Sequence, residues 1–180
     1  MVKNPQWFEW APEGQALAHI GGGGRMATSG KRLRTIAGPS AEPKSYTPQG
    51  KVEQGFAWDG SKRIVAARAA ESEWENEPSQ RPYPALFELD LKSGKQRPLT
   101  EAAKASKSGP YGEYDPIVLL RDRLAWVRSD RAEADIMLSE RHGGQAAWIR
   151  GLELGDNFYE QWRWDAVLAF DAQSLSGPKK

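Results

Sequence analysis

The sequence predicts an all-β protein in which a unit of four antiparallel strands is repeated along the chain. Apolar residues come in short runs of a strand's length, such as 63–67 and 124–127, and never in long helical stripes. Turn residues separate these runs, as in the Asp-Gly pair at 59–60, because glycine supplies the positive φ of tight hairpins. The stretch 56–100 returns in variant form at 115–150. A repeat of this length is typical of stacked β units.

Aligning the copies predicts where the units and their strands lie. We expect units at 5–37, 52–100 and 114–151 and a partial one at 157–175, about three and a half units in one domain covering 1–180. The strands expected in the second unit are 54–58, 63–67, 85–91 and 95–99, and those in the third are 116–120, 123–128, 135–140 and 145–150.

Three segments fit the repeat less well. In the first unit a tetraglycine at 21–24 occupies the place where a third strand is expected. The basic cluster at 31–34 is expected to be the solvated end of a strand. The segment 100–106 begins with a threonine at a capping position and predicts the chain's one short helix.

Composition excludes several classes of function. Lys plus Arg number 25 and Asp plus Glu 24, and this balance argues against a general nucleic-acid binder, which needs a basic excess. The chain has no cysteine, so disulfides and thiolate chemistry are excluded. It has no apolar run of the ~20 residues that a membrane span requires. We therefore expect no nucleic-acid partner and no membrane insertion.

The repeat resembles that of TolB-like β-propellers, also called the WD40-like repeat. The resemblance rests on Trp10 to Ala18 and Trp58 to Val65, which match the repeat's opening strand, turn and apolar strand. Leu86 to Thr100 matches its closing half, an apolar strand, an Asp, a Gly turn and a final Leu-Thr. The resemblance implies a fold of four-stranded propeller blades. It suggests a periplasmic or other extracytoplasmic location, although no signal peptide is visible. A generic antiparallel β-sandwich is the alternative.

No catalytic, cofactor or metal constellation is apparent. The two histidines, His19 and His142, lie in an apolar run and a hairpin turn, so we expect a packed strand residue and a solvated one. The segment 24–32 lacks the spacing and the Ser or Thr of a phosphate-binding loop. The carboxylates at 130–135 lack the pattern of a calcium-binding loop. We expect a protein that is not an enzyme and that needs no cofactor.

Two groups of residues are candidates for binding. Glu73, Trp74 and Glu75 lie in a Glu-rich insertion, and long loops of this kind are often functional. Trp162, Arg163 and Trp164 place two indoles on one side of an expected strand, where they could stack on a sugar or a peptide. The other tryptophans within strands are expected to pack between units.

These observations predict a non-enzymatic binding or scaffold module for a protein or peptide partner. The alternatives are the propeller portion of a peptidase or polysaccharide lyase, or a carbohydrate-binding propeller. Because propellers close into rings of 4–8 blades, three and a half blades would leave apolar sheet faces uncovered. We therefore expect a homodimer that closes a ring, or the remainder of a longer propeller.

Overall fold

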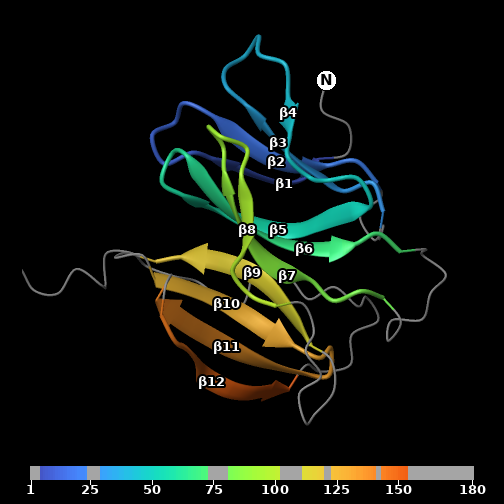
Figure 1. Cartoon of the computed structure of the whole chain (residues 1–180), viewed down its shortest axis with the longest axis vertical. Coiled ribbons are helices and arrows are strands. Elements are labelled where there is room, and N and C mark those ends of the chain that lie inside the picture. The colour runs from blue at the N-terminus through green and yellow to red at the C-terminus, as the bar shows by residue number, and fades with distance from the viewer. Residues whose placement is uncertain are drawn as a thin grey trace, which may run out of the picture.

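The computed structural model describes residues 5–23, 29–72, 81–101, 111–119, 123–140 and 143–153. Within these residues the fold consists of three four-stranded antiparallel sheets, as Figure 1 shows. None of the described residues forms a helix with the length and hydropathy of a membrane span. Of the helix expected at 100–106, residues 102–106 lie outside the described ranges.

Each sheet is a meander in which consecutive strands are hydrogen-bonded neighbours. Short hairpins permit this order, because antiparallel strands can be joined by a tight turn. Sheet 1 contains β1 (Pro5–Trp10), β2 (Leu17–Gly21), β3 (Arg32–Ile36) and β4 (Lys44–Ser45); sheet 2 contains β5 (Lys51–Asp59), β6 (Arg63–Ala70), β7 (Ala85–Asp90) and β8 (Gln96–Pro98); sheet 3 contains β9 (Gly112–Val118), β10 (Arg123–Ser129), β11 (Glu133–Glu140) and β12 (Gln145–Glu153).

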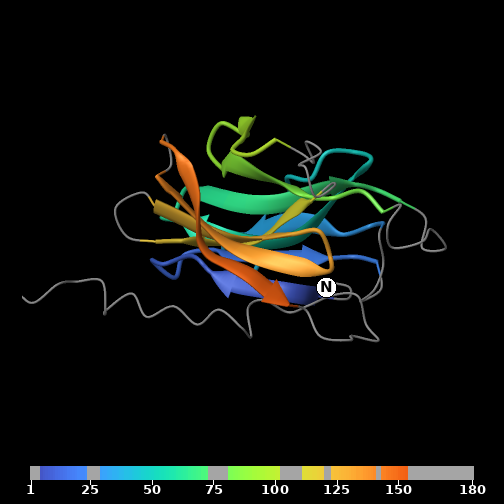
Figure 2. The ribbon, with the colours of Figure 1, turned by 90° about the horizontal axis from the view of Figure 1, so that it is seen from below.

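The three sheets follow one another along the long axis of the molecule (Figure 1), and in the view from below, along that axis, they lie one behind another (Figure 2). The four-strand repeat predicted from the sequence is confirmed in the second and third units. The partial unit expected at 157–175 lies outside the described residues.

The end expected for the first unit, at residue 37, was too early, because sheet 1 continues to β4. The third strand of this sheet is β3, which lies after the glycine run in the sequence. Gly22 and Gly23 have positive φ values of 93° and 63°, so these glycines turn the chain after β2 instead of extending it. Strand β4 has only two residues, both exposed, and therefore carries no apolar signal.

The expectation of a solvated basic cluster at 31–34 was also wrong in part. The side chain of Lys31 is 5% exposed, and Leu33 is fully buried. The backbone oxygen of Lys31 accepts a hydrogen bond from the backbone N–H of Glu53, 3.2 Å away. Lys31 thus lies where sheet 1 meets sheet 2, and burial lowers its pKa.

The two faces of each sheet differ in what they contact. We call the face turned toward the sheet earlier in sequence the preceding face, and the opposite one the following face. Phe56 and Trp58 on the preceding face of sheet 2 form one buried cluster with Ala18, Ile20 and Leu33 of sheet 1. This cluster is the apolar core that joins the first two sheets.

A second buried cluster joins sheets 2 and 3. Val65 and Ala67 on the following face of sheet 2 pack with Leu124, Trp126 and Met137 of sheet 3. The alternation of side chains along β6 explains the division, because successive residues point to opposite faces. Trp58 and Trp126 therefore pack between sheets, as expected for tryptophans in strands.

Sheets 2 and 3 also carry a buried ion pair at matching positions. Glu53 on β5 pairs with Arg68 on β6, with 2.6 Å between Arg68 Nη2 and Glu53 Oε1. Glu113 on β9 pairs with Arg128 on β10 at 2.7 Å. Burial raises the pKa of each glutamate, while its arginine opposes the rise. This recurrence supports the sequence alignment of the two units.

Candidate functional site

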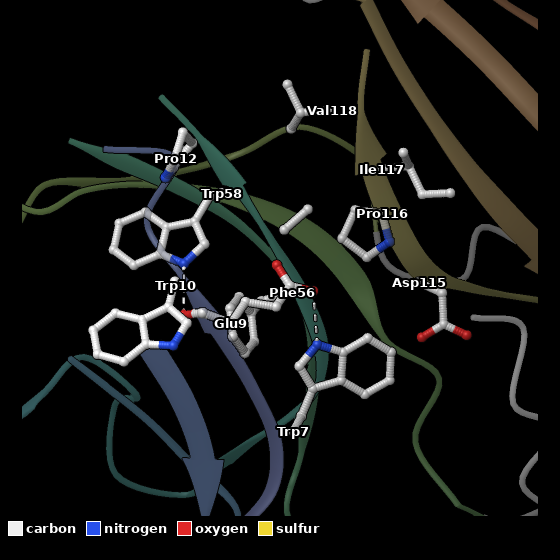
Figure 3. Close-up of a pocket in the computed structure, with 11 residues that line it drawn as sticks. Trp7, Glu9, Trp10, Pro12, Phe56, Trp58, Asp115, Pro116, Ile117 and Val118 are labelled. Carbon is white, nitrogen blue, oxygen red and sulfur yellow. Dashed lines mark hydrogen bonds between the residues drawn. The ribbon is translucent and has the colours of Figure 1, made fainter. Parts of the chain in front are cut away.

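A pocket lies where the first strands of the three sheets come together (Figure 3). We call β1, β5 and β9 the leading strands, because each begins its sheet and lies at the sheet's edge. The pocket has a volume of about 360 Å³, at the lower end of the range of small-ligand sites. Its lining combines aromatic and aliphatic side chains with two carboxylates.

One wall of the pocket is aromatic and is held together across the boundary between sheets 1 and 2. The rings of Trp7 and Phe56 lie 6.5 Å apart and are tilted by 57°, a geometry that suits two aromatic quadrupoles. The indole N–H of Trp58 donates to the backbone oxygen of Glu9 at 3.1 Å. Trp10 completes this wall and remains 63% exposed. These contacts leave an indole available to an incoming ligand.

The Glu9 carboxylate lies among these rings (Figure 3). Its Oε1 accepts a hydrogen bond from the indole N–H of Trp7 at 3.1 Å, which holds the side chain in place. Burial raises the pKa of Glu9, and the bond from Trp7 opposes the rise. A cation placed beside Glu9 would favour the ionised form and would gain from the low local dielectric.

Asp115 supplies the second carboxylate from the opposite wall (Figure 3). It lies where the pairing of β9 with β10 shifts register, and its φ is 43°, an unusual value for a residue other than glycine. Gly55 of β5 makes this placement possible. A Cβ at Gly55 would lie 2.8 Å from Asp115 Oδ1, so any larger residue there would displace the carboxylate.

Aliphatic residues of β9 close the rest of this wall. Pro116, Ile117 and Val118 line the pocket beside Asp115. The site therefore presents apolar area, aromatic faces and two carboxylates. Aromatic faces and carboxylates both attract cations. The edges of the leading strands add backbone groups of the kind that extended peptides pair with.

All six residues proposed from the sequence for binding lie outside the described residues. These are Glu73, Trp74, Glu75, Trp162, Arg163 and Trp164. His142 also lies outside them, whereas His19 is a buried strand residue, as predicted. Within the described part of the chain, no cluster of three or more His, Asp or Glu side chains could hold a metal ion.

Sequence reasoning missed the pocket because its residues come from three separate units. It assigned tryptophans within strands to packing, which holds for Trp58 and Trp126 but not for Trp10 and Trp148, 63% and 66% exposed. A usable signal was present in the repeat itself. Trp10 is the last residue of β1 and Trp58 the second-last residue of β5, which predicts that they lie near each other where the units meet.

No protein-family model and no curated protein sequence matches this chain. The similarity to known proteins lies in the fold. TolB from Agrobacterium tumefaciens superposes with a TM-score of 0.59 and 12% identity over 85% of this chain and 53% of that one. A conserved lipoprotein from Clostridium novyi NT superposes with a TM-score of 0.55 and 9% identity over 82% of this chain and 89% of that one.

A third similar structure is a puromycin-hydrolyzing peptidase from Mycobacterium tuberculosis. Its TM-score is 0.55 with 12% identity, over 86% of this chain but only 23% of the peptidase. This chain thus spans about half of TolB and less than a quarter of the peptidase. The three meander sheets, the clusters between them and these superpositions agree: the chain has the fold of a TolB-like β-propeller, of which the described residues form three successive blades.

Proposed function

We propose that this chain is a non-enzymatic binding module that holds a basic peptide segment of a protein partner in the pocket of the leading strands. The observation that carries the proposal is the composition of this pocket. Three indoles and a phenyl ring stand together with the carboxylates of Glu9 and Asp115. This combination suits a lysine or arginine side chain, whose charge meets the carboxylates while its stem packs on the rings.

The position of the pocket favours a peptide as the carrier of that cation. The leading strands are edge strands, and an extended peptide can pair with an exposed strand edge through its backbone. Backbone pairing supplies affinity without sequence preference, and the acidic, aromatic pocket then selects the side chain. In this proposal the propeller is the scaffold of the site, because the packed sheets hold the three leading strands in place.

A binding assay with matched peptides tests the proposal. Isothermal titration would compare three extended peptides of equal length whose central residue is Lys, Gln or Glu. We expect the Lys peptide to bind about tenfold more tightly than the Gln peptide, a difference of ~1.4 kcal/mol, and the Glu peptide most weakly. Equal affinity for all three would contradict the choice of a basic ligand, and no binding by any would contradict the proposed function.

Variants of the chain locate the binding. Glu9→Gln keeps the shape of the side chain and removes its charge, so it should reduce the preference for the Lys peptide. Trp10→Ala should weaken binding of every peptide, because it removes an exposed indole from the pocket wall. The matched control is Trp148→Ala, which removes an indole of similar exposure on β12. An equal loss for both tryptophan variants would place the binding elsewhere.

The aromatic wall also favours a second candidate, carbohydrate binding, because indole faces stack on sugar rings. A panel of neutral oligosaccharides in the same titration separates the two. Saturable binding of an oligosaccharide that Trp10→Ala abolishes, together with no binding of the Lys peptide, would favour the carbohydrate.

A further inference from the structure

We infer that the pocket of the leading strands takes a quaternary ammonium group, carried by a trimethylated lysine of the partner peptide, in preference to the ammonium group of an unmodified lysine. The inference rests on the proposed function and names the form of the basic side chain that the same site selects. Both forms carry one positive charge, but they differ in hydrogen bonding. A lysine ammonium has three N–H donors, whereas a trimethylated one has none and presents methyl groups instead.

Aromatic rings line the pocket on more than one side. Trp10 is 63% exposed and Trp7 is partly buried. Phe56 and Trp58 are 1% and 7% exposed and form the base of the pocket. In the view of Figure 3, Trp10 and Trp58 lie on one side of the Glu9 side chain and Trp7 lies on the other. Several aromatic rings around one charge are the arrangement by which proteins recognise quaternary ammonium groups.

Two oxygen atoms of Glu9 are already engaged by indole groups of this wall. The indole N–H of Trp7 donates to Glu9 Oε1, and that of Trp58 donates to the backbone oxygen of Glu9, each at 3.1 Å. A lysine ammonium that entered here would have to share these oxygens or leave N–H groups unpaired, which is costly away from water. A trimethylated ammonium needs no acceptor, so the same wall receives it without this cost.

The carboxylates make the positive charge of the ligand necessary. Glu9 and Asp115 line the pocket from opposite walls, and their attraction to a cation acts through space and needs no N–H group. The volume of about 360 Å³ is small for a whole small-molecule ligand and suits the end of one side chain. A neutral group with the shape of a trimethylated ammonium should therefore bind more weakly than the cation.

Isothermal titration of the full 180-residue chain tests the inference. The peptides have equal length and carry at their centre Lys, Gln, trimethylated lysine or the neutral analogue of trimethylated lysine in which carbon replaces the quaternary nitrogen. We expect the trimethylated peptide to bind about tenfold more tightly than the Lys peptide and than the neutral analogue. Tetramethylammonium chloride tests the source of the group. It should bind more weakly than the trimethylated peptide, and equal affinity would overturn the assignment to a peptide.

Variants at Trp10 separate the aromatic face from apolar bulk. Trp10→Leu keeps an apolar side chain but removes the ring, so it should abolish the preference for the trimethylated peptide over the neutral analogue. Trp10→Phe keeps a ring and should retain most of that preference. The matched control is Trp148→Leu on β12, which changes an indole of similar exposure and should leave the preference unchanged. Circular dichroism verifies the folding of each variant, and the peptide comparison on the unaltered chain needs no variant.

Two results would overturn the inference. One is a trimethylated peptide that binds no more tightly than the Lys peptide, and the other is a neutral analogue that binds as tightly as the trimethylated peptide. If the Lys peptide still binds more tightly than the Gln peptide, the proposed function stands and only this inference falls. If none of the peptides binds, the proposed function falls as well.

Discussion

Phe8 and Phe56 form a matched pair that tests the packing of the blades, because they occupy equivalent positions in successive units. Phe56 is 1% exposed within the cluster between sheets 1 and 2. Replacing it with alanine removes a buried ring and leaves a cavity, at a cost of about 3–5 kcal/mol. Phe8 is 67% exposed, so Phe8→Ala should cost less than ~1 kcal/mol in the monomer.

The assay is thermal denaturation followed by tryptophan fluorescence. For a domain of this size, a loss of 1 kcal/mol lowers the melting temperature by about 2–4 °C, so the two variants should differ by roughly 10 °C. If Phe56→Ala leaves too little folded protein, Phe56→Leu and Phe8→Leu give the same comparison at smaller cost.

Equal destabilisation by the two alanine variants would refute this reasoning. It would mean that Phe8 is covered in the isolated chain.

Three further predictions concern single side chains. Burial and the nearby charge of Arg34 lower the pKa of His19 from 6.5. Because the unfolded chain then binds a proton at His19 more readily than the folded chain does, the unfolding free energy should fall as the pH decreases below about 6.5. Denaturation curves measured from pH 8 to pH 5 should show this fall, and His19→Gln should flatten it. Arg128→Met removes the partner of the buried Glu113 and should destabilise the fold by about 3–5 kcal/mol. The double variant Arg128→Met, Glu113→Gln should recover part of this loss in thermal melts, and the absence of any recovery would contradict the pairing. Gly55→Ala places a Cβ 2.8 Å from Asp115 Oδ1 and should weaken binding of the Lys peptide more than that of the Gln peptide, whereas Gly94→Ala, in a turn with open space around it, should leave both affinities unchanged.

The strands of sheets 2 and 3 were predictable because two local signals agree there. Apolar runs such as that in β6 are bounded by turn residues, and the same pattern recurs in β10. The third and fourth strands of sheet 1 gave weaker signals. In β3, Arg32 and Arg34 flank Leu33, a pattern that indicates the solvated end of a strand rather than a whole one. Strand β4 is held by pairing with β3 rather than by any apolar side chain. Tertiary pairing, and not local propensity, determines these two strands.

The pocket was not predictable from any one segment, because stacking of the sheets brings its residues together. Glu9, Trp58 and Asp115 lie on three different leading strands. Taken one by one in the sequence, Glu9 is a glutamate in a strand, Trp58 is a tryptophan expected to pack between units, and Asp115 is the first residue of a repeat. They form a site only because the sheets stack and because the irregular pairing of β9 positions Asp115.

The most direct test of the central claim is an NMR titration of the ¹⁵N-labelled chain with the Lys peptide, followed through the indole N–H signals of its tryptophans. Each signal is assigned by single substitution. The account predicts that the signals of Trp7, Trp10 and Trp58 shift in a saturable manner, because these indoles line the pocket, while those of Trp126 and Trp148 stay in place. A titration in which the Trp148 signal moves and the three pocket signals do not would contradict the claim that the leading strands form the binding site.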